Sequence, residues 1–124
     1  MPTVERAART DAGLASELRV SVMRLRRRLA LERHPDNDLS MSQMAVLGWI
    51  YRKGEQSVGD LATAEGVQPP SMTRTVKTLL AAGYVARRKH ETDGRQVVIS
   101  LTDLGIATVR ADRARRDAWL SRRL

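Results

Sequence analysis

The chain has 124 residues, a formal net charge of +8 and no cysteine. This length suggests one domain with a modest core, and the lack of cysteine excludes disulfides, thiolate zinc sites and thiol redox sensing. The charge favours a polyanionic partner, either nucleic acid or an anionic membrane surface. No apolar run has the length of a signal peptide or a membrane span, so we expect a soluble, cytoplasmic protein that does not enter a membrane.

Arginine supplies most of the positive charge, since only Lys53, Lys77 and Lys89 are lysines. A guanidinium group suits phosphates and guanine edges better than an ammonium group does. A high arginine content can equally reflect genomic base composition. Both explanations remain open at this point.

The first predicted element is an amphipathic helix from Asp11 to Arg33. Its apolar residues recur at steps of three and four, as on one helical face; they are Leu14, Leu18, Val22, Leu25 and Leu29. His34-Pro35 should end the helix, because proline disfavours helical geometry in the residue before it. The arginines at 26–28 are interpreted as a solvated face with some phosphate contact.

Residues 39–54 are predicted to form a second helix, because Ser40 and Gln43 have capping-box spacing and Gly54 supplies a stop. Its expected buried face is Met44, Leu47 and Ile50. A short third helix is expected in 57–66. There Ser57 and Asp60 repeat the capping offset and Gly66 can adopt the left-handed turn.

Residues 67–83 are predicted to form a fourth helix, since Pro69 and Pro70 fit only at or before a first helical turn and Gly83 closes it. The expected apolar face is Met72, Val76, Leu79 and Leu80. The opposite face carries Ser71, Thr73, Arg74, Thr75 and Lys77.

After Gly83 the pattern changes to that of strands. The runs 84–88 and 96–101 are strand candidates, and alternation in the second predicts a buried face of Val97, Ile99 and Leu101. Asp-Gly between such runs is a strong hairpin signal. Thr102 then caps a last helix, 103–120, with one side made of Ala107, Ala111, Ala114 and Ala118.

This order predicts a mainly α fold with a small β-hairpin. Two helices joined by a short glycine turn make a helix-turn-helix, in which Ala62, four residues before Gly66, permits close approach. The hairpin that follows makes it a winged helix-turn-helix. Residues 68–95 contain six basic residues and two acids, whereas 35–67 contain two basic residues and five acids. The basic balance therefore lies on the second helix of the motif and on the wing.

A helix of this kind fits the major groove of DNA, where short polar and forked basic side chains can bind base edges. We assign Gln68, Ser71, Arg74 and Thr75 to base edges or adjacent phosphates, and Lys77 to phosphate. A plain solvated face is the alternative for any one of them. The full set of predicted DNA-binding residues is Gln68, Ser71, Thr73, Arg74, Thr75, Lys77, Arg87, Arg88, Lys89, Asp93, Gly94 and Arg95.

Residues 58–105 resemble the core of the multiple antibiotic resistance regulator (MarR) family. The shared marks are "L..GYV.R", an Asp-x-Arg wing and a closing "LT..G"; here they are Leu79, Gly83, Tyr84, Val85, Arg87, Asp93, Arg95, Leu101, Thr102 and Gly105. The segment "LSMSQMAVL" also resembles the family's second helix. The resemblance covers about residues 14–118 and is specific as a set.

The resemblance implies a homodimeric transcriptional regulator, usually a repressor, that binds a pseudo-palindromic site on double-stranded DNA. It implies one domain over 1–124, with a DNA-binding core at 39–101 and dimerisation helices at 11–34 and 102–124. Arg95 would enter the minor groove, where narrow A/T-rich tracts concentrate negative potential. Asp93 would brace Arg74 or Arg87, or would simply form the turn.

Family members usually continue into a further helix that helps to join two subunits, whereas this chain ends at "WLSRRL". Either dimerisation uses the first and closing helices alone, or the sequence is shortened. The alanine spacing along 107–118 would permit close helix packing, although it is equally typical of any good helix former.

Many relatives release DNA when a small aromatic or phenolic ligand binds beside the dimerisation helices. The candidate pocket residues are His34, Met44, Trp49, Tyr51 and Arg52, and core or surface packing is their alternative role. An enzyme, a metal site or a cofactor is not expected, since His34 and His90 are the only histidines and neither has metal-ligand spacing. An RNA-binding winged helix would need more exposed aromatics, and a protein-interaction module would not need the basic surplus.

Overall fold

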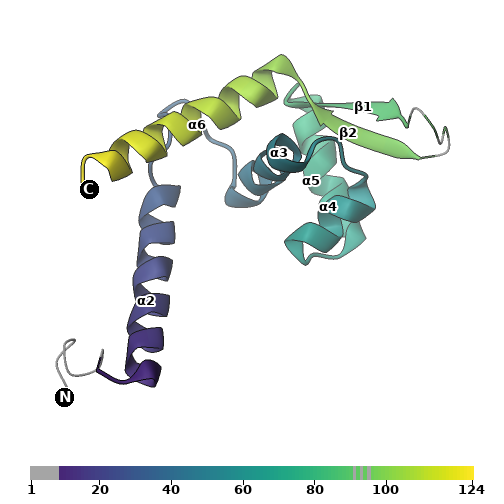
Figure 1. Cartoon of the computed structure of the whole chain (residues 1–124). Coiled ribbons are helices and arrows are strands. Elements are labelled where there is room, and N and C mark those ends of the chain that lie inside the picture. Colours follow the sequence, from purple (N-terminus) through teal and green to yellow (C-terminus); the bar gives the residue numbers. More distant parts are fainter. Residues whose placement is uncertain (1–8, 91, 93, 95) are drawn as a thin grey trace. The chain divides into compact units, whose positions relative to one another are not determined.

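The computed structural model describes residues 9–90, 92, 94 and 96–124. Its elements (Figure 1) are the helices and strands α2 (Asp11–Ala30), α3 (Met41–Lys53), α4 (Val58–Glu65), α5 (Pro69–Ala81), β1 (Val85–Lys89), β2 (Val97–Leu101) and α6 (Asp103–Ser121). The chain forms two compact units. Residues 34–115 make one, here called the winged unit, and residues 1–33 with 116–124 make the other, here called the helical unit. The predicted mainly helical fold with a two-stranded wing is confirmed.

The helices of the winged unit begin where their caps predict. The Ser40 hydroxyl accepts a hydrogen bond from the Gln43 amide at 3.1 Å, and the Gln43 Oε1 atom accepts one from the Ser40 amide at 2.8 Å. This reciprocal pair is the predicted capping box of α3. Ser57 caps α4 in the same way, by accepting from the Asp60 amide at 3.0 Å. Each start is therefore fixed by local hydrogen bonds.

The helix ends are set by glycines in two cases and by tight turns in a third. Gly54 and Gly66 have φ values of 85° and 65°, which is the region that glycine adopts without a Cβ clash. The predicted end of the first helix at Arg33 is wrong, because α2 ends at Ala30. The amides of Leu31 and Glu32 donate to carbonyls three residues earlier, both at 3.1 Å. These tight turns stop the helix before the proline can act.

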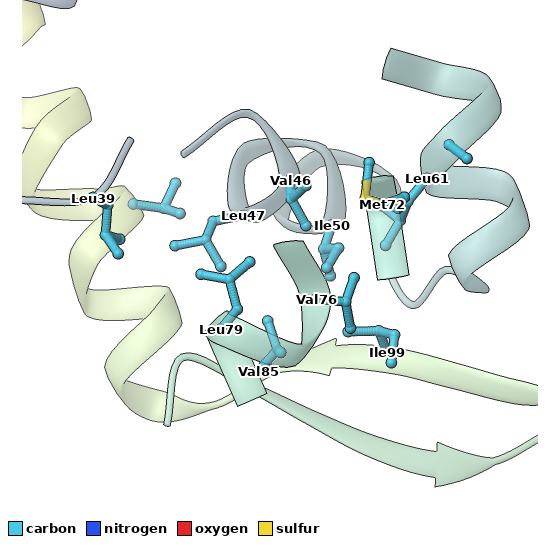
Figure 2. Packing of buried hydrophobic residues seen from close by; sticks show 12 residues of the cluster. Leu39, Val46, Leu47, Ile50, Leu61, Met72, Val76, Leu79, Val85 and Ile99 are labelled. Carbon is cyan, nitrogen blue, oxygen red and sulfur yellow. The ribbon is translucent and has the colours of Figure 1, made fainter. Parts of the chain in front are cut away.

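The core of the winged unit brings together α3, α4, α5 and the hairpin (Figure 2). Its largest fully buried side chains are Leu47, Leu61, Leu79, Ile99 and Val46. Met44 and Leu80 were expected in the buried faces of their helices but are only partly buried against this cluster. Val46 takes the place of Met44, because α3 presents it to the core together with Leu47 and Ile50.

The wing is an antiparallel pair in which Val85 lies opposite Leu101 and Lys89 lies opposite Val97. Gln56 adds an isolated bridge, since its amide donates to the Ile99 carbonyl at 3.1 Å and its carbonyl accepts from the Ile99 amide at 2.7 Å. The wing base is therefore held by main-chain bonds on both sides of β2.

The predicted alternation of β2 is wrong at its first two residues. Val98 and Ile99 are both buried, whereas Val97 is 39% exposed. Val97 occupies the last rung before the hairpin loop, and the core packs at the other end, near Val85 and Ile99 (Figure 2). A strand that leaves the core in this way does not keep one face buried along its length.

The start of α6 is held against the turn that follows α5. The Thr102 hydroxyl donates to the Gly83 carbonyl at 2.6 Å and accepts from the Gly105 amide at 3.2 Å, so the predicted cap is confirmed. A Cβ atom at Gly105 would lie 2.2 Å from the Tyr84 carbonyl oxygen. Only glycine fits this close approach.

The helical unit contains α2 and the end of α6. α2 has no buried residue, and its apolar stripe is largely open: the exposed fractions are 52% at Leu14, 62% at Leu18 and 55% at Val22. The guanidinium carbons of Arg28 and Arg123 lie 4.5 and 4.1 Å from the centre of the Trp119 ring. Within the described part of the chain, no helix is both long and apolar enough to cross a membrane.

Candidate nucleic-acid interface

The amino-terminal end of α5 leaves Gln68 available for a partner. Gln68 is the N-cap residue, yet its side chain makes no capping hydrogen bond. Pro69 and Pro70 fill the first two helical positions, and proline has no amide proton that would need an acceptor there. The exposed Gln68 amide is therefore not required to start the helix.

The outer face of α5 carries charge between shorter polar groups. Arg74 and Lys77 are exposed, whereas Ser71, Thr73 and Thr75 are half-buried. The Thr75 hydroxyl donates to the Ser71 carbonyl at 3.2 Å, which commits its proton to the helix. The two cations are thus the groups of this face that reach furthest into solvent.

A shallow polar cleft of about 310 Å³ lies beside this face. It is lined by six residues, Ser40, Gln43, Ser71, Arg74, Thr75 and Thr78. Three of them belong to the predicted DNA-binding set, and three do not. Thr78 could have been found from the sequence, since it lies four residues after Arg74 on the same helical face. Ser40 and Gln43 could not, because their place beside α5 depends on how α3 packs.

The wing carries three exposed cations on β1, Arg87, Arg88 and Lys89. Arg88 is engaged within the protein: its Nε atom donates to Glu55 Oε1 at 2.7 Å, and its Nη2 atom donates to Glu55 Oε2. This two-pronged pair joins the wing to the segment between α3 and α4. Sequence reasoning did not anticipate Glu55, because no spacing rule connects residues so far apart.

The predicted wing tip is only partly described. Asp93 and Arg95 lie outside the described residues, so their predicted roles have no structural counterpart here. Gly94 is described and is exposed. The cations on β1 and the face of α5 are therefore the described parts of the predicted interface.

Three of the five residues predicted to form an effector pocket, Met44, Trp49 and Tyr51, pack against the core cluster, whereas His34 and Arg52 are exposed. His34 accepts from the Asp36 amide at 3.1 Å, and Met44 packs against the core. Arg52 is exposed, and its guanidinium carbon lies 5.8 Å from the centre of the Trp49 ring. The cleft beside α5 contains none of these residues.

Tyr51, the fifth, lies against α6. Its hydroxyl accepts a hydrogen bond from Arg110 Nε at 3.3 Å, and the Arg113 guanidinium carbon lies 5.2 Å from its ring centre. The hydrogen bond from Arg110 lowers the pKa of Tyr51, because it favours the phenolate. In this corner of the winged unit, the Tyr51 phenol therefore lies beside two cations, Arg110 and Arg113.

A buried carboxylate anchors the segment that leads into α3. Asp112 is only 4% exposed, and its Oδ2 atom accepts from Asn37 Nδ2 at 3.0 Å. Asn37 Oδ1 in turn accepts from the Leu39 amide at 3.1 Å. Asp112 therefore helps to set where α3 begins, and with it the position of Ser40 and Gln43.

A basic helix, a preceding helix joined through a glycine turn, and a two-stranded wing together define the winged helix-turn-helix class of DNA-binding proteins. The model of the MarR family matches residues 39–97. A helix-turn-helix transcriptional regulator of Mycobacterium tuberculosis is 44% identical over 115 residues, covering 93% of this chain and 80% of that protein. The chain belongs to the MarR family of transcriptional regulators, and DNA binding follows from that membership.

Two solved structures show the same fold. A MarR family protein from Bacillus stearothermophilus matches with a TM-score of 0.80 and 24% identity, over 92% of this chain and 79% of that one. A mutant of Staphylococcus aureus MepR, bound to an oligodeoxyribonucleotide, matches with a TM-score of 0.70 and 20% identity, over 87% and 79%. At these identities the likeness concerns the fold.

Proposed function

We propose that the protein is a repressor that binds a pseudo-palindromic operator as a homodimer. The observation that carries the proposal is the exposed face of α5, where Gln68, Arg74 and Lys77 point away from a well-packed core. In this arrangement α5 lies in the major groove and each wing lies in the flanking minor groove. Bound across a promoter, such a dimer represses by occlusion.

The side chains divide by what they can contact. Gln68, Ser71, Arg74 and Thr75 lie toward base edges or adjacent phosphates, with Thr73 beside them, and Lys77, Arg87 and Lys89 are cations for phosphates. Arg88 acts through its pair with Glu55, which steadies the wing. Arg95, with Gly94 as the turn and Asp93 as the brace, is assigned to the minor groove.

The homodimer is supported by the open apolar stripe of α2. Leu14, Leu18 and Val22 are each more than half exposed, so the helical unit leaves this apolar face of α2 open to a partner. A second copy offers the same stripe, so a two-fold axis would bring two self-complementary faces together. Dimerisation also doubles the DNA contacts, as a palindromic site requires.

Release by a small aromatic or phenolic ligand remains a prediction with less support. Tyr51 offers two nearby cations that would suit an anionic ligand. Titrating a bound complex with phenolic acids, and repeating this with Tyr51→Phe, tests the prediction. Unchanged DNA affinity across the panel would count against it.

The DNA-binding proposal is tested by gel-shift titration on a genomic promoter fragment and on random duplex. We expect tighter binding to the fragment and a steep loss of affinity as salt rises, because each phosphate contact releases counterions. Equal affinity for both duplexes, independent of salt, would refute the proposal. Preference for single-stranded RNA would instead favour an RNA-binding winged helix, and no nucleic-acid binding would favour a protein-interaction module.

The wing assignment has its own test in Arg95→Ala. If Arg95 enters a narrow minor groove, the variant should lose most affinity at operators with A/T-rich flanks. Binding constants for duplexes that differ only in their flanks measure this dependence. A loss that is equal for all flanks would make Arg95 a phosphate contact without a role in specificity.

A further inference from the structure

The cleft between the start of α3 and the face of α5 is rich in hydrogen-bond donors. All six lining side chains carry a hydrogen-bond donor: the hydroxyls of Ser40, Ser71, Thr75 and Thr78, the amide of Gln43 and the guanidinium of Arg74. None of the six is acidic, and Arg74 supplies a fixed positive charge. The cleft therefore suits a group that only accepts hydrogen bonds.

The existing hydrogen bonds strengthen this bias. Gln43 Oε1 accepts a hydrogen bond from the Ser40 amide. Within the described residues the Gln43 Nε2 group has no such bond, so its two protons can bind a group from outside the protein. The Ser40 oxygen accepts from the Gln43 amide, so its hydroxyl proton remains. The capping box that starts α3 thus uses the Gln43 and Ser40 side-chain oxygens as acceptors, and the protons of both side chains stay available for a ligand.

The three hydroxyl groups that α5 adds to the cleft differ in whether their protons are already used. Ser71 Oγ accepts a long hydrogen bond of 3.5 Å from Arg74 Nη2, and its own proton is left over. Thr75 and Thr78 donate to carbonyls one turn earlier, at 3.2 and 3.1 Å. Their hydroxyl protons are therefore already used, and the two side chains only line the wall of the cleft. The donors not already used by the protein backbone are therefore those of Ser40, Gln43, Ser71 and Arg74.

We propose that this cleft binds one backbone phosphate in each half-site of the operator, held by Gln43, Ser71 and Arg74, with Ser40 as a further donor. This rests on the proposed function, because α5 must lie in the major groove for a DNA strand to pass along its flank. A phosphate presents only acceptor oxygens, whereas base edges mix donors and acceptors. Ser40 and Gln43 thereby join the DNA-binding surface from α3, outside the helix-turn-helix itself.

Gln43→Glu is the sharpest variant. Glutamate at the third helical position also completes a capping box, so α3 should keep its start. The substitution replaces the amide donors with a carboxylate that repels a phosphate. Ser16→Glu, on the exposed side of α2 opposite its apolar stripe, changes the net charge equally and serves as the control. Melting curves of both variants check that the fold is retained.

The measurement is fluorescence-anisotropy binding to the duplex selected by the wild type, over a salt series. For Gln43→Glu we expect affinity to fall at least about tenfold, and the slope of log affinity against log salt to shrink by about two phosphates' share, one from each subunit, roughly 1.8. The loss should be the same for operator variants that differ in single bases. Ser16→Glu should stay close to the wild type.

Two results would overturn the proposal while leaving DNA binding intact. One is a Gln43→Glu variant that keeps the affinity and salt slope of the Ser16→Glu control. The other is a loss confined to one base pair, which would mean that the cleft contacts a base. A wild type that does not distinguish its selected duplex from random DNA would instead refute the proposed function itself.

Ser71→Ala gives a second test that does not involve the capping box. It removes one donor from the cleft, and we expect about a threefold loss that is uniform across operator variants. Replacing single phosphates of the duplex with neutral methylphosphonates then locates the contact. At one position in each half-site the wild type should weaken and Gln43→Glu should not weaken further; additive losses at every position would contradict the cleft.

Discussion

The two units of the chain differ in how completely they bury their apolar residues. α5 has 13 residues, of which three are buried, whereas α2 has 20 residues and none that is buried. The winged unit can therefore fold around its own core, since Leu47, Leu61, Leu79 and Ile99 fill it. In the helical unit, by contrast, the apolar stripe of α2 is open at Leu14, Leu18 and Val22, and the homodimer proposed above would cover it.

The largest expected effect compares a leucine from each unit. Leu79→Ala should lower the free energy of unfolding of the winged unit by about 3 kcal/mol, because Leu79 is fully buried and a cavity would remain. Leu18→Ala should change it by less than about 0.5 kcal/mol, since Leu18 is 62% exposed. Denaturant titration followed by Trp49 fluorescence, in a Trp119→Phe background, measures both. Equal losses would contradict the contrast.

A charge on the stripe should act on assembly and leave the winged core folded. Val22→Glu would have to bury two carboxylates at a two-fold interface, so we expect the dimer dissociation constant to rise about a hundredfold. Ser16→Glu, on the opposite side of α2, is the matched control. Sedimentation equilibrium gives the constants. If both variants dimerise like the wild type, α2 does not form the interface.

The junction between α5, β1 and α6 gives a smaller effect within the winged unit. Gly105→Ala should cost about 2 kcal/mol, because the new methyl group would meet the Tyr84 carbonyl oxygen at 2.2 Å. Gly59→Ala meets only ordinary contact, 3.8 Å from Ser57 Oγ, and should gain about 0.5 kcal/mol from helix propensity. Thermal unfolding of the two variants checks that the melting temperature falls for Gly105→Ala and rises for Gly59→Ala.

The smallest effect concerns Tyr51. In a Tyr84→Phe background, phenolate absorbance should show Tyr51 ionising below the usual tyrosine pKa, because Arg110 donates to its hydroxyl. Arg110→Gln should raise the pKa again. Since the folded pKa is the lower one, the associated stability is present at alkaline pH and is lost as pH falls through that pKa. An unchanged titration in the variant would contradict the contact.

Sequence patterns predicted those features that are encoded locally. The capping box of Ser40 and Gln43, the prolines that start α5 and the glycine after α4 each depend on residues within one turn. The wing followed from Asp-Gly between two strand-like runs. Fold class and family therefore needed no tertiary information.

Most of the missed features depend on tertiary packing. The Glu55–Arg88 pair, the Asn37–Asp112 bond and the place of Gln43 beside α5 join residues that are far apart in sequence. One missed feature is local: tight turns at Leu31 and Glu32 end α2 at Ala30, before the residue that precedes Pro35. The DNA contacts assigned to α5 and the wing remain predictions, and Asp93 and Arg95 lie outside the described residues.

The central claim is that a dimer reads DNA through α5 and the wing, and selection of bound duplexes from a random pool tests it most directly. The account predicts enrichment of an inverted repeat whose half-sites lie about one helical turn apart, with A/T-rich positions where the wings fall. Enrichment of a single unrepeated site, or no enrichment over random duplex, would contradict it.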